Sequence, residues 1–115
     1  MKVTRFADAK PYEAPNHYDI RSLRLQGFES GGPETFWVGL SHFLPGGGAG
    51  PDASPIEKVY VILEGQLTVR VGDSELILGP RDSCCIPPNE VREVKNNSNS
   101  VATMIVVLPY PKAQT

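Results

Sequence analysis

The sequence predicts an all-β protein, a barrel or jelly roll built from roughly eight to ten short strands. Eleven glycines and eleven prolines are spread between short apolar runs, which is typical of many strands joined by tight turns. The runs are rich in β-branched residues or alternate apolar with polar side chains. No segment keeps an apolar stripe at helical spacing, so long helices are not expected.

The first part of the chain combines an irregular arm with two predicted strands. Residues 1–20 contain prolines and polar side chains, and we expect an N-terminal arm with one short strand at 3–6. Residues 21–26 alternate apolar and polar side chains, which indicates a strand. Residues 35–44 form the next strand, which a proline ends. The glycine-rich segment 46–55 shows no periodicity and is predicted to be a loop.

The middle of the chain is predicted to form a series of hairpins. Residues 57–63 are a β-branched run that ends at a Glu-Gly turn. Residues 67–71 and 75–78 follow as strands on either side of a Gly-Asp turn. Such regular spacing of short strands and turn residues is typical of consecutive antiparallel strands.

Three more strands are predicted in the last third of the chain. Residues 83–86 form a strand that two prolines stop. Residues 90–95 alternate, and the polar segment 96–100 is expected to turn. Residues 101–108 are the most apolar strand, and a proline-containing tail follows them.

Length and composition limit the classes of protein to consider. A chain of 115 residues fits one domain, residues 1–115, and a net charge of -2 gives no indication of nucleic-acid or anionic-membrane binding. There is no N-terminal apolar run and no stretch of ~18 apolar residues, so neither a signal peptide nor a membrane span is expected. Cys84 and Cys85 point to opposite faces of one strand, and free thiols favour a cytoplasmic location.

A first motif lies between residues 46 and 65. This segment begins and ends with glycine and holds Asp52, Ser54 and Lys58 at set spacings between them. It resembles the first motif of the cupin family, in which two histidines and a glutamate lie between the two glycines. Asp52 and Ser54 occupy the histidine positions, and Lys58 occupies the glutamate position.

A second motif lies at residues 81–96 and holds Pro87, Arg92 and Asn96. It resembles the second cupin motif, which runs from a glycine through Pro-x-Gly and a histidine to an asparagine. Asn89 stands for the inner glycine, and asparagine tolerates left-handed backbone. Arg92 occupies the histidine position, and an arginine replaces the opening glycine.

The resemblance implies a double-stranded β-helix, the jelly-roll barrel of cupins, preceded by the N-terminal arm. The chain resembles a small single-domain cupin that lacks the usual metal ligands. Cupins often dimerise through the arm and sheet edges, so a homodimer is expected. The family hosts enzymes, sugar-binding regulators and storage proteins, so the fold alone does not name an activity.

The replaced ligand positions predict a cationic pocket. Lys58 and Arg92 are positively charged and therefore poor metal ligands. We expect them to attract a small anion, such as the carboxylate or the enolate oxygen of a substrate. Asp52 and Ser54 are predicted to contact this ligand, because they occupy the histidine positions of the first motif. Tyr60 is predicted to contact it as well, because it shares a strand face with Lys58.

Two structural alternatives remain open at these positions. An ion pair between Asp52 and Lys58 would fill the space left by the metal and close the pocket. A slip of one residue would place Glu57 inside the barrel and send Lys58 outside.

His42, Lys58 and Arg92 are the predicted catalytic residues. His42 lies at the end of the strand that leads into the first motif, where it would act as a general acid or base at the barrel mouth. The alternative is a hydrogen-bonded histidine of the barrel wall. His17 lies in the arm and is expected to be exposed.

The main hypothesis is a metal-independent cupin that binds a small anionic compound and acts as a lyase or isomerase, with no cofactor. Enolate chemistry needs a base and positive charge near the oxyanion, and these residues supply both. The first alternative is a non-catalytic binding or regulatory module. The second is a metal enzyme in which His42, Asp52 and Glu57 hold a divalent cation.

Overall fold

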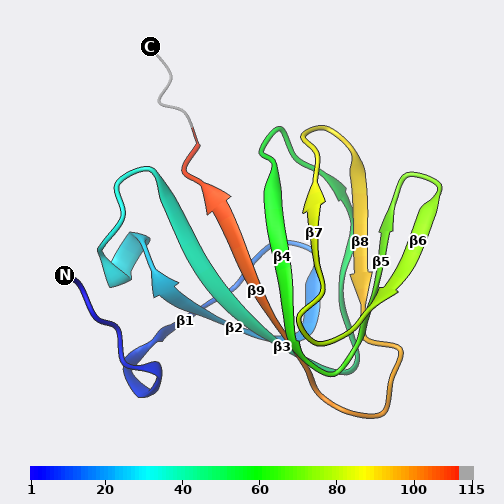
Figure 1. Cartoon of the computed structure of the whole chain (residues 1–115), viewed down its shortest axis with the longest axis horizontal. Coiled ribbons are helices and arrows are strands. Elements are labelled where there is room, and N and C mark those ends of the chain that lie inside the picture. The colour runs from blue at the N-terminus through cyan, green and yellow to red at the C-terminus, as the bar shows by residue number, and fades with distance from the viewer. Residues whose placement is uncertain (112–115) are drawn as a thin grey trace.

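The computed structural model describes residues 1–111 and confirms an all-β fold (Figure 1). Its helices, η1 (Phe6–Asp8) and η2 (Phe28–Ser30), are single 3-10 turns. Within the described residues no helix is long and apolar enough to span a membrane. The strands are β1 (Lys10–Tyr12), β2 (His17–Gln26), β3 (Phe36–Ala53), β4 (Lys58–Glu64), β5 (Leu67–Val71), β6 (Ser74–Leu78), β7 (Ser83–Ile86), β8 (Val91–Lys95) and β9 (Ala102–Pro109).

Strand β3 connects the two halves of a nearly closed jelly-roll barrel. Its first part pairs with β9, and its second part pairs with β8. The order of the sheet is therefore β6-β5-β8-β3-β9-β4-β7, with β2 also paired to β3 (Figure 1). All these pairs are antiparallel. The predicted series of hairpins is confirmed at β5–β6, but β4 pairs with β7 and β9 rather than with β5.

The prediction of a loop over residues 46–55 is wrong, because β3 continues to Ala53. The backbone of this segment pairs with β8 on one side and with the start of β2 on the other. Glycine permits the close approach of these strands: a Cβ on Gly48 would lie 2.6 Å from the carbonyl oxygen of Val94. Glycine has no side chain to alternate, so the strand leaves no periodic pattern in the sequence.

The N-terminal arm also differs from its prediction. Residues 3–6 form no strand, and Phe6 begins the η1 turn instead. Strand β1 folds back onto β2 of the same chain, with Tyr12 opposite Ser22. Strand β2 begins at His17, four residues before the predicted start. The homodimer stays a prediction.

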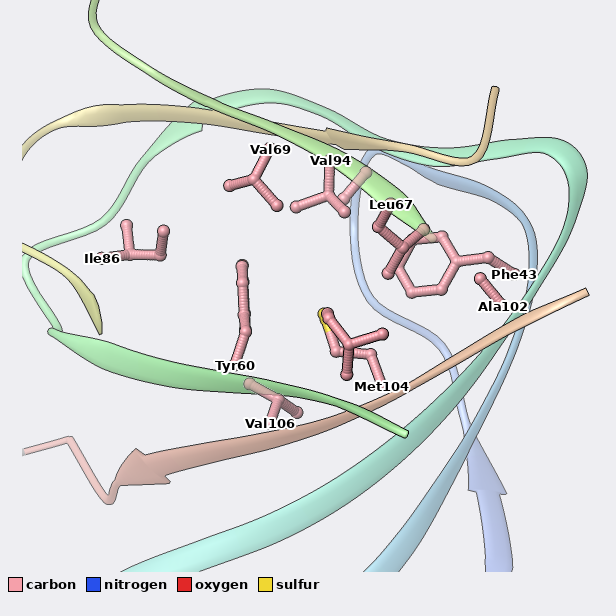
Figure 2. Packing of buried hydrophobic residues seen from close by; sticks show 11 residues of the cluster. Phe43, Tyr60, Leu67, Val69, Ile86, Val94, Ala102, Met104 and Val106 are labelled. Carbon is pink, nitrogen blue, oxygen red and sulfur yellow. The ribbon is translucent and has the colours of Figure 1, made fainter. Parts of the chain in front are cut away.

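The core fills the space between the two halves of the barrel. Figure 2 shows Tyr60 and Met104 pointing inward from one side and Val69 and Val94 from the other. The most deeply buried apolar side chains include Phe43, whose exposed fraction is 1%. Burying one large apolar side chain stabilises the fold by about 1.5–3 kcal/mol, so this cluster supplies much of the driving force for folding.

Left-handed backbone occurs at glycine positions of both motifs. Gly65 has a φ of 72°, and a Cβ there would lie 2.7 Å from the carbonyl oxygen of Val101. Asn89 has a φ of 66°, which confirms that it replaces the motif's glycine in a left-handed conformation. Arg81 has a φ of 72°, so this position keeps the glycine conformation although it carries a large side chain.

Replacing Arg81 with glycine is expected to raise the free energy of unfolding by about 0.5–1 kcal/mol. Left-handed backbone costs an L-residue about 1–2 kcal/mol, and the greater flexibility of unfolded glycine offsets part of this gain. Urea unfolding followed by the fluorescence of Trp37 measures the change. As a control, Arg21→Gly lies in β2 and is expected to destabilise the protein. A loss of stability in the Arg81 variant would contradict the prediction.

Candidate functional site

A cavity of about 210 Å³ lies inside the barrel, among side chains from β3, β4, β8, β9 and the arm. One part of its wall is apolar and includes Phe43, Val94 and Met104. The residues that line it are Tyr12, Ala14, Pro15, His17, Ser41, Phe43, Ala49, Asp52, Ser54, Lys58, Tyr60, Arg92, Val94, Met104, Val106 and Leu108.

The structure brings five of the six predicted site residues together in this cavity: Asp52, Ser54, Lys58, Tyr60 and Arg92. Asp52 and Arg92 are opposite each other on β3 and β8. Lys58 and Tyr60 project from the same face of β4, because side chains on a strand alternate. These residues, distant in sequence, therefore line one cavity.

Arg92 is the most deeply buried charge of the site, with an exposed fraction of 5%. Its Nη1 donates a hydrogen bond of 3.3 Å to the carbonyl oxygen of Gly50. Its Nε is buried and has no hydrogen-bond partner among the described residues. A buried guanidinium with an unused donor is costly, and an anion in the cavity would offset that cost.

Lys58 lies at the same cavity and is half-buried. Burial lowers the pKa of Lys58, the charge of Arg92 lowers it further, and Asp52 opposes both effects. The ion pairs of the described chain are Arg24–Glu29, at 3.4 Å, and Arg70–Glu93, at 3.0 Å. Asp52 and Lys58 therefore do not form the pair that would close the pocket.

Lys58, rather than Glu57, faces the barrel interior. Glu57 is exposed and does not line the cavity, so the register slip of one residue does not occur. The glutamate position of the first motif is therefore occupied by a cation.

The two tyrosines at the cavity supply neutral hydroxyl groups. Burial raises the pKa of Tyr60 to about 12, although the charge of Arg92 acts in the opposite direction. Burial also raises the pKa of Tyr12, and Arg24 opposes this shift. Both phenols stay protonated near neutral pH, so each can donate a hydrogen bond to a ligand.

The donor set at the four ligand positions does not fit a divalent cation. Asp52 is the single anionic group there, and Lys58 and Arg92 would repel a metal ion. Over residues 1–111, no group of three or more His, Cys, Asp or Glu side chains lies close enough to hold one. In particular, His42, Asp52 and Glu57 do not converge, so we derive no chemistry through a metal.

His42 lies outside the cavity, which corrects its expected position at the barrel mouth. Its neighbours Ser41 and Phe43 flank it on β3, and since Phe43 points inward, His42 points outward. The Nδ1 atom lies 3.1 Å from Oγ1 of Thr103, and the ring meets Phe6 edge to face. His42 is thus a hydrogen-bonded histidine on the outer wall of the barrel.

His17 is exposed, as the sequence predicts, but it also lines the cavity, which the sequence did not predict. Much of its surface is exposed, as expected for a residue at the cavity mouth. Burial of the ring lowers the pKa of His17, and the charges of Arg92 and Lys58 add to this shift. Alternation did not reveal this position, because a bulge with a φ of 51° at Asp19 interrupts β2.

Comparison with known proteins gives a consistent family assignment. The cupin domain family matches residues 39–108 of this chain. The beta-D-galactosidase Rv1717 of Mycobacterium tuberculosis is 42% identical over 114 residues, which cover 99% of this chain and 98% of that protein.

Solved structures show the same barrel. The polyketide cyclase RemF from Streptomyces resistomycificus gives a TM-score of 0.85 at 20% identity, covering 99% of this chain and 82% of that one. A predicted oxalate decarboxylase from Thermotoga maritima gives a TM-score of 0.79 at 18% identity, covering 95% and 98%. At these identities the likeness supports the fold alone.

Proposed function

This chain belongs to the cupin family, and we propose that it binds a small organic acid in its barrel cavity without using a metal ion. The observation that carries the proposal is the buried guanidinium of Arg92, which has an unused Nε donor and no ion-pair partner among the described residues. An arginine can bind a carboxylate through two parallel hydrogen bonds. A bound anion would supply the charge and the acceptor that Arg92 lacks.

The size and lining of the cavity support one small ligand. Its volume of about 210 Å³ is below the range of roughly 300–1,000 Å³ that is usual for drug-sized ligands. The apolar side chains of Met104 and Val106 line the cavity and suit a ligand with a short hydrocarbon chain. Ser54 and Tyr60 offer hydroxyl groups for further polar contacts.

Lys58 suggests the class of reaction. Its ammonium group lies at the same cavity as Arg92 and would stabilise negative charge on a second oxygen of the ligand. Removing a proton next to a carbonyl group creates such a charge, so we propose a lyase or isomerase that passes through an enolate. If acids bind but undergo no reaction, the protein would be a binding module instead.

The binding of a small acid is expected to weaken as the pH rises through the lowered pKa of Lys58, below its ordinary value of 10.5. The reason is that only the ammonium form attracts the anion. Without ligand, the pKa of Lys58 is lowered in the folded state and has its ordinary value of 10.5 in the unfolded state. Between these two pKa values the unfolded chain binds more protons than the folded chain, so the free energy of unfolding rises with pH in this range. Calorimetric titration with pyruvate and urea unfolding at several pH values measure the two trends.

The variant Lys58→Met is expected to lose both trends, whereas Lys95→Met, on the exposed end of β8, should keep them. If the affinity for pyruvate falls equally with rising pH in the wild type and in the Lys58 variant, the role of Lys58 is contradicted.

A second candidate function is the hydrolysis of β-D-galactosides. It is favoured by the identity of 42% to a protein named as a beta-D-galactosidase over nearly the full length of both chains. Most glycosidases use two carboxylates, spaced about 5–9.5 Å apart. Asp52 is the one carboxylate that lines the cavity in the described chain, so its partner would have to be a group such as His17 or Tyr60.

If the chain hydrolyses o-nitrophenyl β-D-galactoside, Asp52→Asn is expected to lower kcat/KM by about 100-fold or more, because the one carboxylate that residues 1–111 place at the cavity is lost. Release of nitrophenol measures the rate. The matched control Asp73→Asn changes an exposed aspartate beside the β6 strand and should leave the rate unchanged. A wild-type rate no greater than that of buffer would reject this candidate.

A further inference from the structure

We propose that His17 is the catalytic base of the cavity, and that it moves a proton to and from the carbon next to a carbonyl group of the bound acid. This inference rests on the proposed function, because it needs an acid held by Arg92. It replaces the outward-facing His42 with a histidine that the arm delivers to the cavity mouth.

The pairing of β2 with β3 sets the direction of His17. His17 lies opposite Ala49, and Ala49 lies opposite Val94 on β8. Partners in antiparallel strands project to the same face of a sheet, and all three residues line the cavity. The His17 ring therefore lies on the same inner face as Arg92, which occupies the next inward position of β8.

A hydrogen bond determines which nitrogen of His17 acts as the base. The Nδ1 atom lies 2.7 Å from the carbonyl oxygen of Pro15. A carbonyl oxygen only accepts hydrogen bonds, so Nδ1 must carry the proton in the neutral ring. The lone pair is then on Nε2, which has no hydrogen-bond partner among the described residues.

Burial and the positive charges around the ring favour the unprotonated form of this base. Burial lowers the pKa of His17, and Arg92 on β8 and Lys58 on β4 act in the same direction. The Pro15 hydrogen bond and Asp52 on β3 oppose them. Glu13 and Asp19 share a neighbouring hollow with His17 but are not among the causes of the shift.

The proposed step conserves atoms and charge. For a 2-oxo acid, Arg92 binds the carboxylate, and Lys58 faces the oxo oxygen. Nε2 of His17 takes a proton from the adjacent carbon, and the electrons of the C–H bond form the C=C bond of the enolate. The negative charge moves to the oxo oxygen beside Lys58, and return of the proton restores the acid. No oxidant, reductant or second substrate is needed.

The test is the exchange of the methyl protons of pyruvate with solvent in D₂O, followed by proton NMR. The wild-type protein is expected to speed the exchange over buffer. His17→Gln should lower the protein-catalysed rate by about 10²–10⁴-fold, as is usual when a general base is removed. The same variant should still bind pyruvate, because Arg92 is unchanged. The control His42→Gln, on the outer wall, should exchange at the wild-type rate.

Nitrogen-15 NMR of the imidazole gives a second measurement that needs no ligand, and it should show the proton on Nδ1. A proton on Nε2 would overturn the inference, and so would pyruvate that binds without exchange or exchanges equally fast with His17→Gln. In these cases the proposed binding function would stand. If the wild-type protein does not bind pyruvate at all, the inference and the proposed function both fail.

Discussion

Replacing Arg92 with methionine is expected to weaken the binding of small carboxylates strongly and, at the same time, to stabilise the protein. Arg92 is 5% exposed and leaves its Nε donor without a partner in the described chain. Losing a charged hydrogen-bond partner of a ligand costs about 2–5 kcal/mol, so affinity should fall at least about 30-fold. Replacing an uncompensated buried charge with an apolar side chain of similar length should add about 1–3 kcal/mol of stability.

This pair of opposite effects separates a binding residue from a structural one. Calorimetric titration with pyruvate measures affinity, and urea unfolding without ligand measures stability. Lys95→Met removes an exposed charge from the same strand and should change neither quantity much. If Arg92→Met binds pyruvate as well as the wild type, the proposed site is wrong. If it binds no pyruvate but also unfolds easily, Arg92 is a structural residue.

Replacing Asn96 with alanine is expected to lower the free energy of unfolding by about 2–4 kcal/mol. The side chain of Asn96 is fully buried and closes the turn before β9. Its Nδ2 donates to the carbonyl oxygens of Phe43, at 2.9 Å, and Ser100, at 2.8 Å. Its Oδ1 accepts from the backbone and side chain of Ser98. Each buried polar group left unpaired costs about 1–3 kcal/mol, and alanine leaves several.

The neighbouring Asn97 offers a matched control for this change. Its side chain makes one exposed hydrogen bond of 3.2 Å, from Nδ2 to Oγ1 of Thr68. Asn97→Ala should therefore cost less than about 0.5 kcal/mol, as surface substitutions usually do. Urea unfolding of both variants measures the difference. Equal stability of the two variants would show that the hydrogen bonds of Asn96 contribute little net free energy.

The local patterns of the sequence predicted most of the barrel. The alternating or β-branched runs that became β4, β5, β7 and β9 lie within two residues of their predicted bounds. The motif spacing also indicated that Lys58 and Arg92 meet, although β4 and β8 are far apart in the chain. These predictions succeeded because a strand alternates its side chains with a period of two, and that period is visible in the sequence.

The predictions failed where backbone pairing, rather than side-chain pattern, decides the structure. The second part of β3 contains consecutive glycines, which have no side chain to alternate. His42 was misplaced because its position before the first motif does not tell which face of β3 it occupies. The position of η1 and β1 depends on contacts with β2 of the same chain, such as Tyr12 opposite Ser22.

By itself, therefore, the sequence determined most of the strands and the sign of the site, because both follow from side chains at set spacings along the chain. It identified a barrel in which Lys58 and Arg92 replace two metal ligands. Only the tertiary structure decided that Asp52 forms no ion pair with these cations within residues 1–111 and that His17 lines the same cavity. The position of His17 arises from hydrogen bonds between β2 and β3, which carry no residue-specific signal because every backbone offers the same donor and acceptor.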